Sequence, residues 1–163
     1  AGDVIRAAKT PINPEEDLPM LWDRLAELGA QTLSETIPTL ADGTAARTPQ
    51  DGSQVTFAPM LSRELSPIDW TRTAAQIHDQ VRGLLPWPVA STDLFGGDKV
   101  KIFTTIETED KTGKEPGTIL RADKAGIDVA CGGGTVLRIT ELQAPGSRRM
   151  AAEDYLRGHP ITV

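Results

Sequence analysis

The sequence predicts an α+β protein in which helices precede a small antiparallel β-barrel. Apolar residues recur at steps of three and four in the first half of the chain, which is the period of a helix. Beyond Pro88 the apolar period changes to two, and glycine turns separate the short strands. Five such strands between residues 89 and 142 are typical of a closed or half-closed barrel, such as an OB-like one.

The first helix is predicted over about residues 17–41. Thr10 or Asn13 is expected to cap it, and Asp42-Gly43 is a stop signal. Its apolar stripe consists of Leu18, Leu21, Leu25, Leu28, Leu33, Ile37 and Leu40. Only a strand end at Val4-Ile5 accompanies this helix, so it looks like the last layer of a domain that begins upstream.

A second helix is predicted after a polar linker. The linker runs from Thr44 to Ser53, and Val55-Thr56-Phe57 is expected to form a short strand beyond it. Asp69 or Thr71 is expected to cap the helix, and Pro86 ends it because proline cannot continue a helix. The apolar stripe of this helix consists of Trp70, Ala74, Ile77, Val81 and Leu84.

Pro86-Trp87-Pro88 marks the passage from the second helix to the strands. Each proline restricts the residue before it, so a large indole ring is held in one direction at this junction. Tryptophan is usually well buried. We therefore predict that Trp87 packs between helix and sheet, and that its replacement by alanine costs on the order of a few kcal/mol.

The strands are predicted by the alternation of apolar and polar residues. They cover about residues 89–94, 99–107, 117–121, 126–131 and 135–142, with turns at Gly96-Gly97 and Gly132-Gly133-Gly134. A last short helix is expected over about residues 150–157, opened by Arg148-Arg149. Two cations at a helix start oppose the helix dipole, and such a local conflict points to a function for them elsewhere.

The composition is that of a globular protein, with 39% hydrophobic residues and a formal net charge of −6. A single cysteine excludes an internal disulfide and fits a reducing compartment. The sequence has no long apolar run and no signal peptide, which gives no support to a membrane-spanning or secreted protein. Residues 86–163 carry a net charge of only −1, so a local basic face remains open there although the chain as a whole is acidic.

No pattern in the sequence builds an active site. His78 and His159 are far apart and have no metal-ligand partner at a useful spacing, and Cys131 has no neighbouring histidine. Gly132–Gly134 lies between two strands, which excludes the context of a phosphate-binding loop. If the cations of the second half converge, they form a face suited to backbone phosphates. These candidates are Lys99, Lys101, Arg121, Lys124, Arg138, Arg148 and Arg149.

Several short motifs occur in a specific order along the chain. They are Leu25–Gly29, Leu40–Ala45, Ile68–Trp70, Val81–Ala90, Pro116–Leu120, Leu142-Gln143, Pro145-Gly146 and Met150–Gly158. Each is weak alone, but in their order and spacing the chain resembles the C-terminal half of the methionyl-tRNA formyltransferases. The resemblance runs along nearly its whole length.

The resemblance implies a Rossmann-like catalytic domain, a linker and a C-terminal OB-like domain that lies on the tRNA side. Residues 1–43 would be a residual strand-helix piece of the Rossmann-like α/β domain, 44–65 the linker and 66–163 the OB-like domain. It also implies the reaction, which moves a formyl group from 10-formyltetrahydrofolate to the methionine of initiator methionyl-tRNA in the cytoplasm. The family's catalytic asparagine, histidine and aspartate would lie upstream of Ala1. The chain would then hold no catalytic, cofactor or metal site and be inactive alone.

Two other functions stay open. One is the C-terminal half of another formyltransferase, which acts on an amino-sugar nucleotide or hydrolyses formyl-folate. The other is a non-catalytic OB-like module that binds nucleic acid or a partner protein. We also expect residues 1–43 to pack poorly on the barrel, so that their leucine face is exposed or shared with a second copy of the chain.

Overall fold

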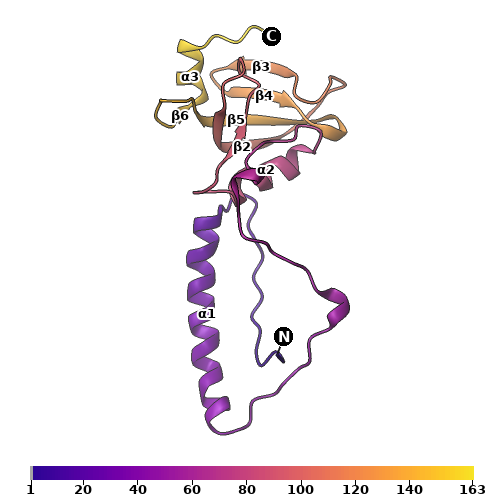
Figure 1. Cartoon of the computed structure of the whole chain (residues 1–163), viewed down its shortest axis with the longest axis vertical. Helices are drawn as coiled ribbons and strands as arrows, with labels where there is room; N and C mark the ends of the chain where they lie inside the picture. Colours follow the sequence, from indigo (N-terminus) through magenta and orange to yellow (C-terminus); the bar gives the residue numbers. More distant parts are fainter. Residues whose placement is uncertain (1) are drawn as a thin grey trace. The chain divides into compact units, whose positions relative to one another are not determined.

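The computed structural model describes residues 2–163, which form two compact units divided between Met60 and Leu61. These residues contain three α-helices and one six-stranded antiparallel sheet, and all the strands belong to the second unit (Figure 1). The α+β class predicted from the sequence is thereby confirmed. None of the helices in residues 2–163 is long and apolar enough to cross a membrane.

The first unit is built on one long helix, α1 (Leu18–Ala41), which matches the predicted 17–41 closely. The prediction that Thr10 or Asn13 caps it was wrong. Asp17 is the cap, and its Oδ1 accepts a hydrogen bond from the backbone nitrogen of Met20 at 2.9 Å. An aspartate directly before the first turn satisfies an otherwise unpaired backbone donor and also complements the helix dipole.

The segments that flank α1 are extended and make few backbone pairs. Val4 and Thr48 form a single antiparallel bridge, with two hydrogen bonds of 2.8 and 2.9 Å. The strand predicted at Val55-Thr56-Phe57 does not form. No other segment among residues 2–163 pairs with these residues through backbone hydrogen bonds. A short 3₁₀ helix, Gly52–Gln54, precedes them instead.

The second unit contains the sheet, whose strands pair in the order β1-β2-β5-β4-β3, with β6 paired to β5. All pairs are antiparallel. Among residues 2–163 no ladder joins β1 to β3, so whether the sheet is best described as OB-like stays a prediction. The strands are β1 (Ala90–Thr92), β2 (Val100–Lys111), β3 (Ile119–Asp123), β4 (Gly126–Ala130), β5 (Thr135–Gln143) and β6 (Met150–Ala151).

Helix α2 (Ala74–Gly83) covers β2 and β5 with its apolar stripe. The prediction that Asp69 or Thr71 caps this helix was wrong. The cap is Thr73, which forms a reciprocal capping box with Gln76. Asp69 instead accepts hydrogen bonds from Thr71 in the turn before the helix. The core beneath the helix consists of Ile77, Val81, Leu84, Val100, Ile102, Ile127, Val129, Leu137, Ile139 and Leu142.

The glycine turn between β4 and β5 is fixed by a close approach of two backbones. The Gly132 nitrogen donates to the carbonyl oxygens of Trp70 and Arg72, at 3.0 and 2.8 Å. A Cβ at Gly132 would lie 1.8 Å from the Thr71 carbonyl oxygen, so no other residue fits. The hairpin predicted here is confirmed, and it joins the sheet to the segment that leads into α2.

The junction at Pro86-Trp87-Pro88 differs from the prediction. Residues 84–88 form turns with cis peptide bonds before both prolines, and the Trp87 side chain is 51% exposed rather than buried. The indole that does plug the core is Trp70, whose Nε1 donates to Thr92 Oγ1 at 3.1 Å. The two prolines restrict the backbone, but they do not determine whether the Trp87 side chain points into the core or toward solvent.

Helix α3 (Ala152–Gly158) begins later than predicted, because Met150-Ala151 forms strand β6. Arg148-Arg149 therefore lies in the turn before β6 and does not open the helix, so the predicted conflict with its dipole does not arise. Glu153 and Asp154 occupy the first turn instead, which suits the dipole.

Candidate nucleic-acid interface

The structure places the seven predicted basic residues in two groups rather than on one face. Lys101 on β2 pairs with Gln143 of β5, whereas Arg138 lies five residues earlier on β5 and pairs with Ile106. At the rise of an antiparallel strand, the two positions are roughly 16 Å apart along the sheet. Arg121, Lys124 and Arg138 make up the group near β3 and β4, and the other four make up the group near β1, β2 and β6.

The group near β3 and β4 is organised around the buried carboxylate of Asp128. Arg121, Asp128 and Arg138 lie directly opposite one another on three neighbouring strands. Arg121 contacts Asp128 at 2.6 Å, and Arg138 contacts it at 2.6 and 3.0 Å. Burial raises the pKa of Asp128, and the charge of Arg121 opposes that rise. Both guanidinium groups are thus engaged in holding the sheet together, which reduces their value as phosphate ligands.

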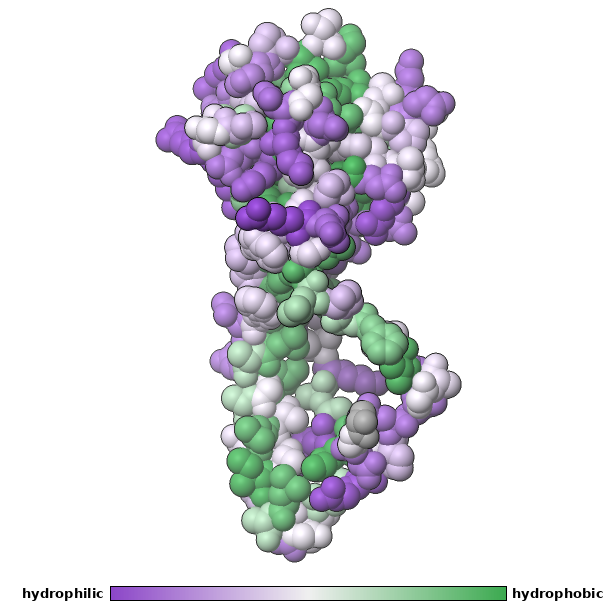
Figure 2. Space-filling view, viewed as in Figure 1, coloured by the Kyte–Doolittle hydropathy of each residue, from purple (hydrophilic) through white to green (hydrophobic). Residues whose placement is uncertain are grey.

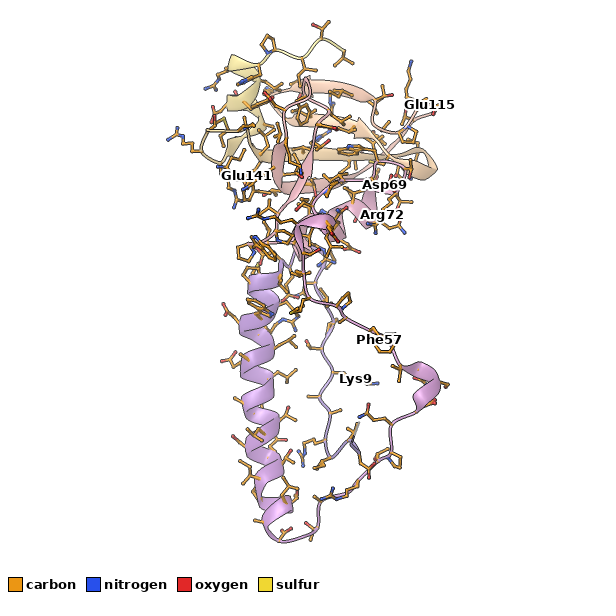
Figure 3. The ribbon with its side chains drawn as sticks, in the orientation of Figure 1. Lys9, Phe57, Asp69, Arg72, Glu115 and Glu141 are labelled. Carbon is orange, nitrogen blue, oxygen red and sulfur yellow. The ribbon has the colours of Figure 1, made fainter. Side chains whose placement is uncertain are left out.

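Arg149 is held in place by β2 and β5. Its guanidinium stacks over the Phe103 ring at 4.7 Å from the centroid and pairs with Glu141, which also accepts a hydrogen bond from Thr104. The hydrogen bonds from Arg149 and then Thr104 hold the pKa of Glu141 below its ordinary value. Figure 3 shows Glu141 toward the β6 side of the sheet, while Asp69 and Arg72 lie toward α2. The contacts pre-position a cation that stays half-exposed.

Lys99 and Lys101 line a cavity of about 410 Å³, called here the Trp87 pocket. Lys101 lies opposite Ser91 in the β1–β2 ladder. The pocket is lined by Arg63, Ser66, Trp87, Pro88, Val89, Ser91, Lys99 and Lys101. Arg63 and Ser91 were not predicted as site residues, because no motif or periodic pattern in the sequence connects these two positions. Trp87 was predicted to lie in the core.

The groups considered for catalysis have structural contacts. His78 is buried, with Nδ1 3.0 Å from Thr105 Oγ1, and the His159 ring stacks on Tyr155. Burial raises the pKa of the Cys131 thiol to about 11, which keeps it protonated near neutral pH. Residues 2–163 contain no cluster of three or more histidine, cysteine or acidic side chains that could hold a metal ion.

Comparison with protein families gives a match over residues 60–160 to the formyl transferase C-terminal domain. The methionyl-tRNA formyltransferase of Bacillus velezensis is 42% identical over 161 residues, which is 99% of this chain and 50% of that protein. The enzyme of the same name from Trichlorobacter lovleyi is 43% identical over 162 residues, again 99% and 50%. The chain thus spans about half the length of the curated relatives it matches.

Solved structures share the fold at lower identity. HypX from Aquifex aeolicus in complex with tetrahydrofolic acid matches with a TM-score of 0.65 and 21% identity, over 96% of this chain and 27% of that one. An N-formyltransferase from Helicobacter canadensis, in complex with folinic acid and dTDP-3-aminofucose, matches with a TM-score of 0.64 and 17% identity. That match covers 88% of this chain and 50% of the other.

Proposed function

The chain belongs to the formyl transferase family through its C-terminal domain, and from this premise we propose that it is the tRNA-side half of a methionyl-tRNA formyltransferase. The complete enzyme would transfer the formyl group of 10-formyltetrahydrofolate to the methionine of initiator methionyl-tRNA, in the cytoplasm. One observation carries the proposal. Relatives named for this activity align with 99% of the chain at 42 to 43% identity.

The proposed roles of the three segments rest on the resemblance to this family. Residues 1–43 would complete the edge of the catalytic domain, 44–65 would form the linker, and 66–163 would hold the tRNA. The catalytic asparagine, histidine and aspartate would come from the other half of the enzyme, so this chain alone would be inactive.

The tRNA contacts would come from the cations near β1, β2 and β6. Lys99, Lys101 and Arg148 have no ion-pair partner in residues 2–163, and Arg149 is oriented by Phe103 and Glu141. Such side chains suit phosphate oxygens, and arginine can bind them with two parallel hydrogen bonds. Arg121 and Arg138 would contribute less, because both are held against the buried carboxylate of Asp128, whereas the carboxylate that pairs with Arg149, that of Glu141, is partly exposed.

The decisive experiment is formyl transfer by the full-length protein to charged initiator tRNA. Replacing Arg148 and Arg149 by glutamine is expected to raise the KM for tRNA about tenfold with little change in kcat, and to reduce the slope of log K against log salt by about 2. The matched control is Arg157→Gln. Arg157 is an exposed arginine of α3 that pairs with Glu153 and Asp154.

Two results would reject the proposal. One is formylation of an amino-sugar nucleotide, with no formylation of charged tRNA. The other is a KM for tRNA that the control variant raises as much as the double variant. A protein that binds tRNA without transferring a formyl group would instead favour the non-catalytic module.

We further propose that two copies of the isolated chain associate through α1. The exposed apolar residues of this helix are Met20, Trp22, Leu25, Leu33, Ile37 and Leu40. At the helical period, all of these except Met20 fall on one side of α1, and an exposed apolar face is unfavourable in water unless it is covered.

A further inference from the structure

The Trp87 pocket has the size of a small-molecule site. Its volume of about 410 Å³ lies within the range of ligand cavities in proteins. It is formed by the 3₁₀ helix Arg63–Leu65, the turn around Trp87, the start of β1 and the start of β2. Three stretches of the chain, 63–66, 87–91 and 99–101, therefore meet at one cavity.

The charge around the pocket has one sign. Arg63, Lys99 and Lys101 line it, and no acidic side chain does so in the described chain. None of these three cations has an ion-pair partner among residues 2–163. In a protein of net charge −6, three uncompensated cations around one cavity favour an anionic ligand.

A buried hydroxyl in the pocket wall lacks a partner. Ser91 is 3% exposed, and its Oγ makes no hydrogen bond. Buried polar atoms are nearly always paired in folded proteins, so an unpaired one calls for an explanation. Ser91 lies opposite Lys101 across the β1–β2 ladder, so the two side chains are on the same face of the sheet.

The remaining wall of the pocket contains the flat Trp87 indole and, two residues later, Val89 in a strained backbone conformation. Trp87 is half-exposed, although an indole of its size would gain from burial. Val89 has a φ of 67°, a conformation that β-branched residues rarely adopt, and its nitrogen donates to the Leu84 carbonyl at 3.0 Å. Strained backbone of this kind is concentrated at binding sites, where it directs a side chain.

We propose that the Trp87 pocket binds a nucleoside monophosphate unit. The phosphate lies among Lys99, Lys101 and Arg63 and pairs with the Ser91 hydroxyl, and the base stacks on the Trp87 indole. Cations provide the affinity for phosphate, and an indole face stacks on any base. The unit comes either from a free nucleotide or from an unpaired nucleotide of an RNA. Only the RNA source rests on the proposed function.

The first test is an NMR titration of the whole chain with 5′-AMP. Saturable shifts are expected at backbone amides of residues 87–91 and 99–101. Adenosine, which lacks the phosphate, is expected to bind at least about tenfold more weakly. Inorganic phosphate, which lacks the base, is expected to be weaker than AMP by a similar factor of about ten.

Variants assign the binding to the pocket. Lys99→Gln combined with Lys101→Gln is expected to weaken AMP about tenfold or more, and Trp87→Leu about tenfold. The matched charge control combines Lys111→Gln with Lys114→Gln, at the other end of β2. The matched indole control is Trp22→Leu on α1. Thermal melts verify that each variant is folded.

An unstructured oligoribonucleotide distinguishes the two sources. Binding at least about tenfold tighter than AMP, and weakened by the same variants, identifies an unpaired nucleotide of RNA. Equal affinities identify a free nucleotide. Either result supports the pocket.

Three results would overturn the inference. They are the absence of saturable AMP binding, equal affinities for AMP and inorganic phosphate, and control variants that weaken AMP as much as the pocket variants. Formylation of charged tRNA by the full-length protein without AMP binding removes only the pocket assignment. AMP binding by a full-length protein that does not formylate tRNA removes only the proposed function.

Discussion

The two units use the same sequence signal with different results. Both α1 and α2 carry apolar residues at steps of three and four, and both form helices. In α2 the stripe is buried under β2 and β5, whereas in α1 the only buried side chain is that of Thr36. Figure 2 shows hydrophobic residues at the surface along α1. The apolar period therefore predicts that a helix forms. It does not predict whether the apolar side of the helix is buried, because that depends on another element that packs against it.

Polar contacts take the place of a core in the first unit. Arg24 donates to both carboxylate oxygens of Glu16, at 2.7 and 2.6 Å, and also to Thr10 and to the Pro11 carbonyl. Arg6 pairs with Glu35 at 2.6 Å. The Arg6–Glu35 pair is exposed to water and therefore adds little net free energy, whereas Arg24 pairs with a buried Glu16 carboxylate. The first unit is thus expected to contribute much less to stability than the second.

The largest expected effect comes from truncating matched apolar residues in the two helices. Ile77→Ala removes a fully buried side chain of α2 and is expected to lower the free energy of unfolding of the second unit by about 4 kcal/mol. Leu33→Ala removes an exposed side chain of α1 and is expected to cost less than about 0.5 kcal/mol. Urea unfolding followed by circular dichroism measures both. Equal losses would contradict the contrast between the two units.

The glycine turn of the second unit gives the next largest effect. Gly132→Ala places a methyl group against the Thr71 carbonyl, and it is expected to destabilise the second unit by about 3 kcal/mol. Gly113→Ala is the control, because nothing lies within 4 Å of a Cβ at that position. Chemical denaturation of both variants is the measurement. A Gly132 variant as stable as the control would show that the two backbones separate at little cost.

A smaller effect is expected on the association of the first unit. Leu33→Glu combined with Ile37→Glu places charges on the exposed face of α1, and it is expected to weaken dimers of the isolated chain by at least about tenfold. Sedimentation equilibrium measures the change. Glu107→Gln on β2 serves as an unrelated surface control. A wild-type chain that remains monomeric at millimolar concentration would remove this proposal.

The helices and most strands could be predicted from the sequence, because they depend on local periodicity. The contacts between strands could not, because they depend on the register of strand pairing. The helices and five strands follow from periods of 3.6 and 2, and the short β6 lacks enough residues to show either. Asp128 pairs with both Arg121 and Arg138 only because β3, β4 and β5 pair in one particular register. Arg63, Ser91 and Lys101 meet through long-range pairing that no local pattern encodes.

Trp87 illustrates the same limit at a single position. The flanking prolines and the usual burial of tryptophan led to a prediction of a core residue, but the ring is half-exposed. The expected cost of Trp87→Ala therefore falls from a few kcal/mol to below about 1 kcal/mol. Trp70, identified from its place in the helical stripe, is the indole that fills the core.

The smallest expected effect concerns the ion pair that orients Arg149 in the second unit. Since the folded state holds the pKa of Glu141 below its ordinary value of 4.5, the unfolded chain binds its proton more readily. The resulting stabilisation is fully present above pH 4.5 and is lost as the pH falls through the lower folded pKa. Because the pair is partly exposed, its contribution is expected to stay below about 1 kcal/mol.

This effect is measured as the difference in free energy of unfolding between the wild type and Glu141→Gln, followed from pH 7 down to pH 3. The difference is expected to vanish at the acid end and also in a background that carries Arg149→Met, since the charge partner is then missing. A Glu141 carboxyl that titrates at or above 4.5 in NMR would show that Arg149 is not held by it. The orientation of that arginine toward a phosphate would then depend on the Phe103 ring alone.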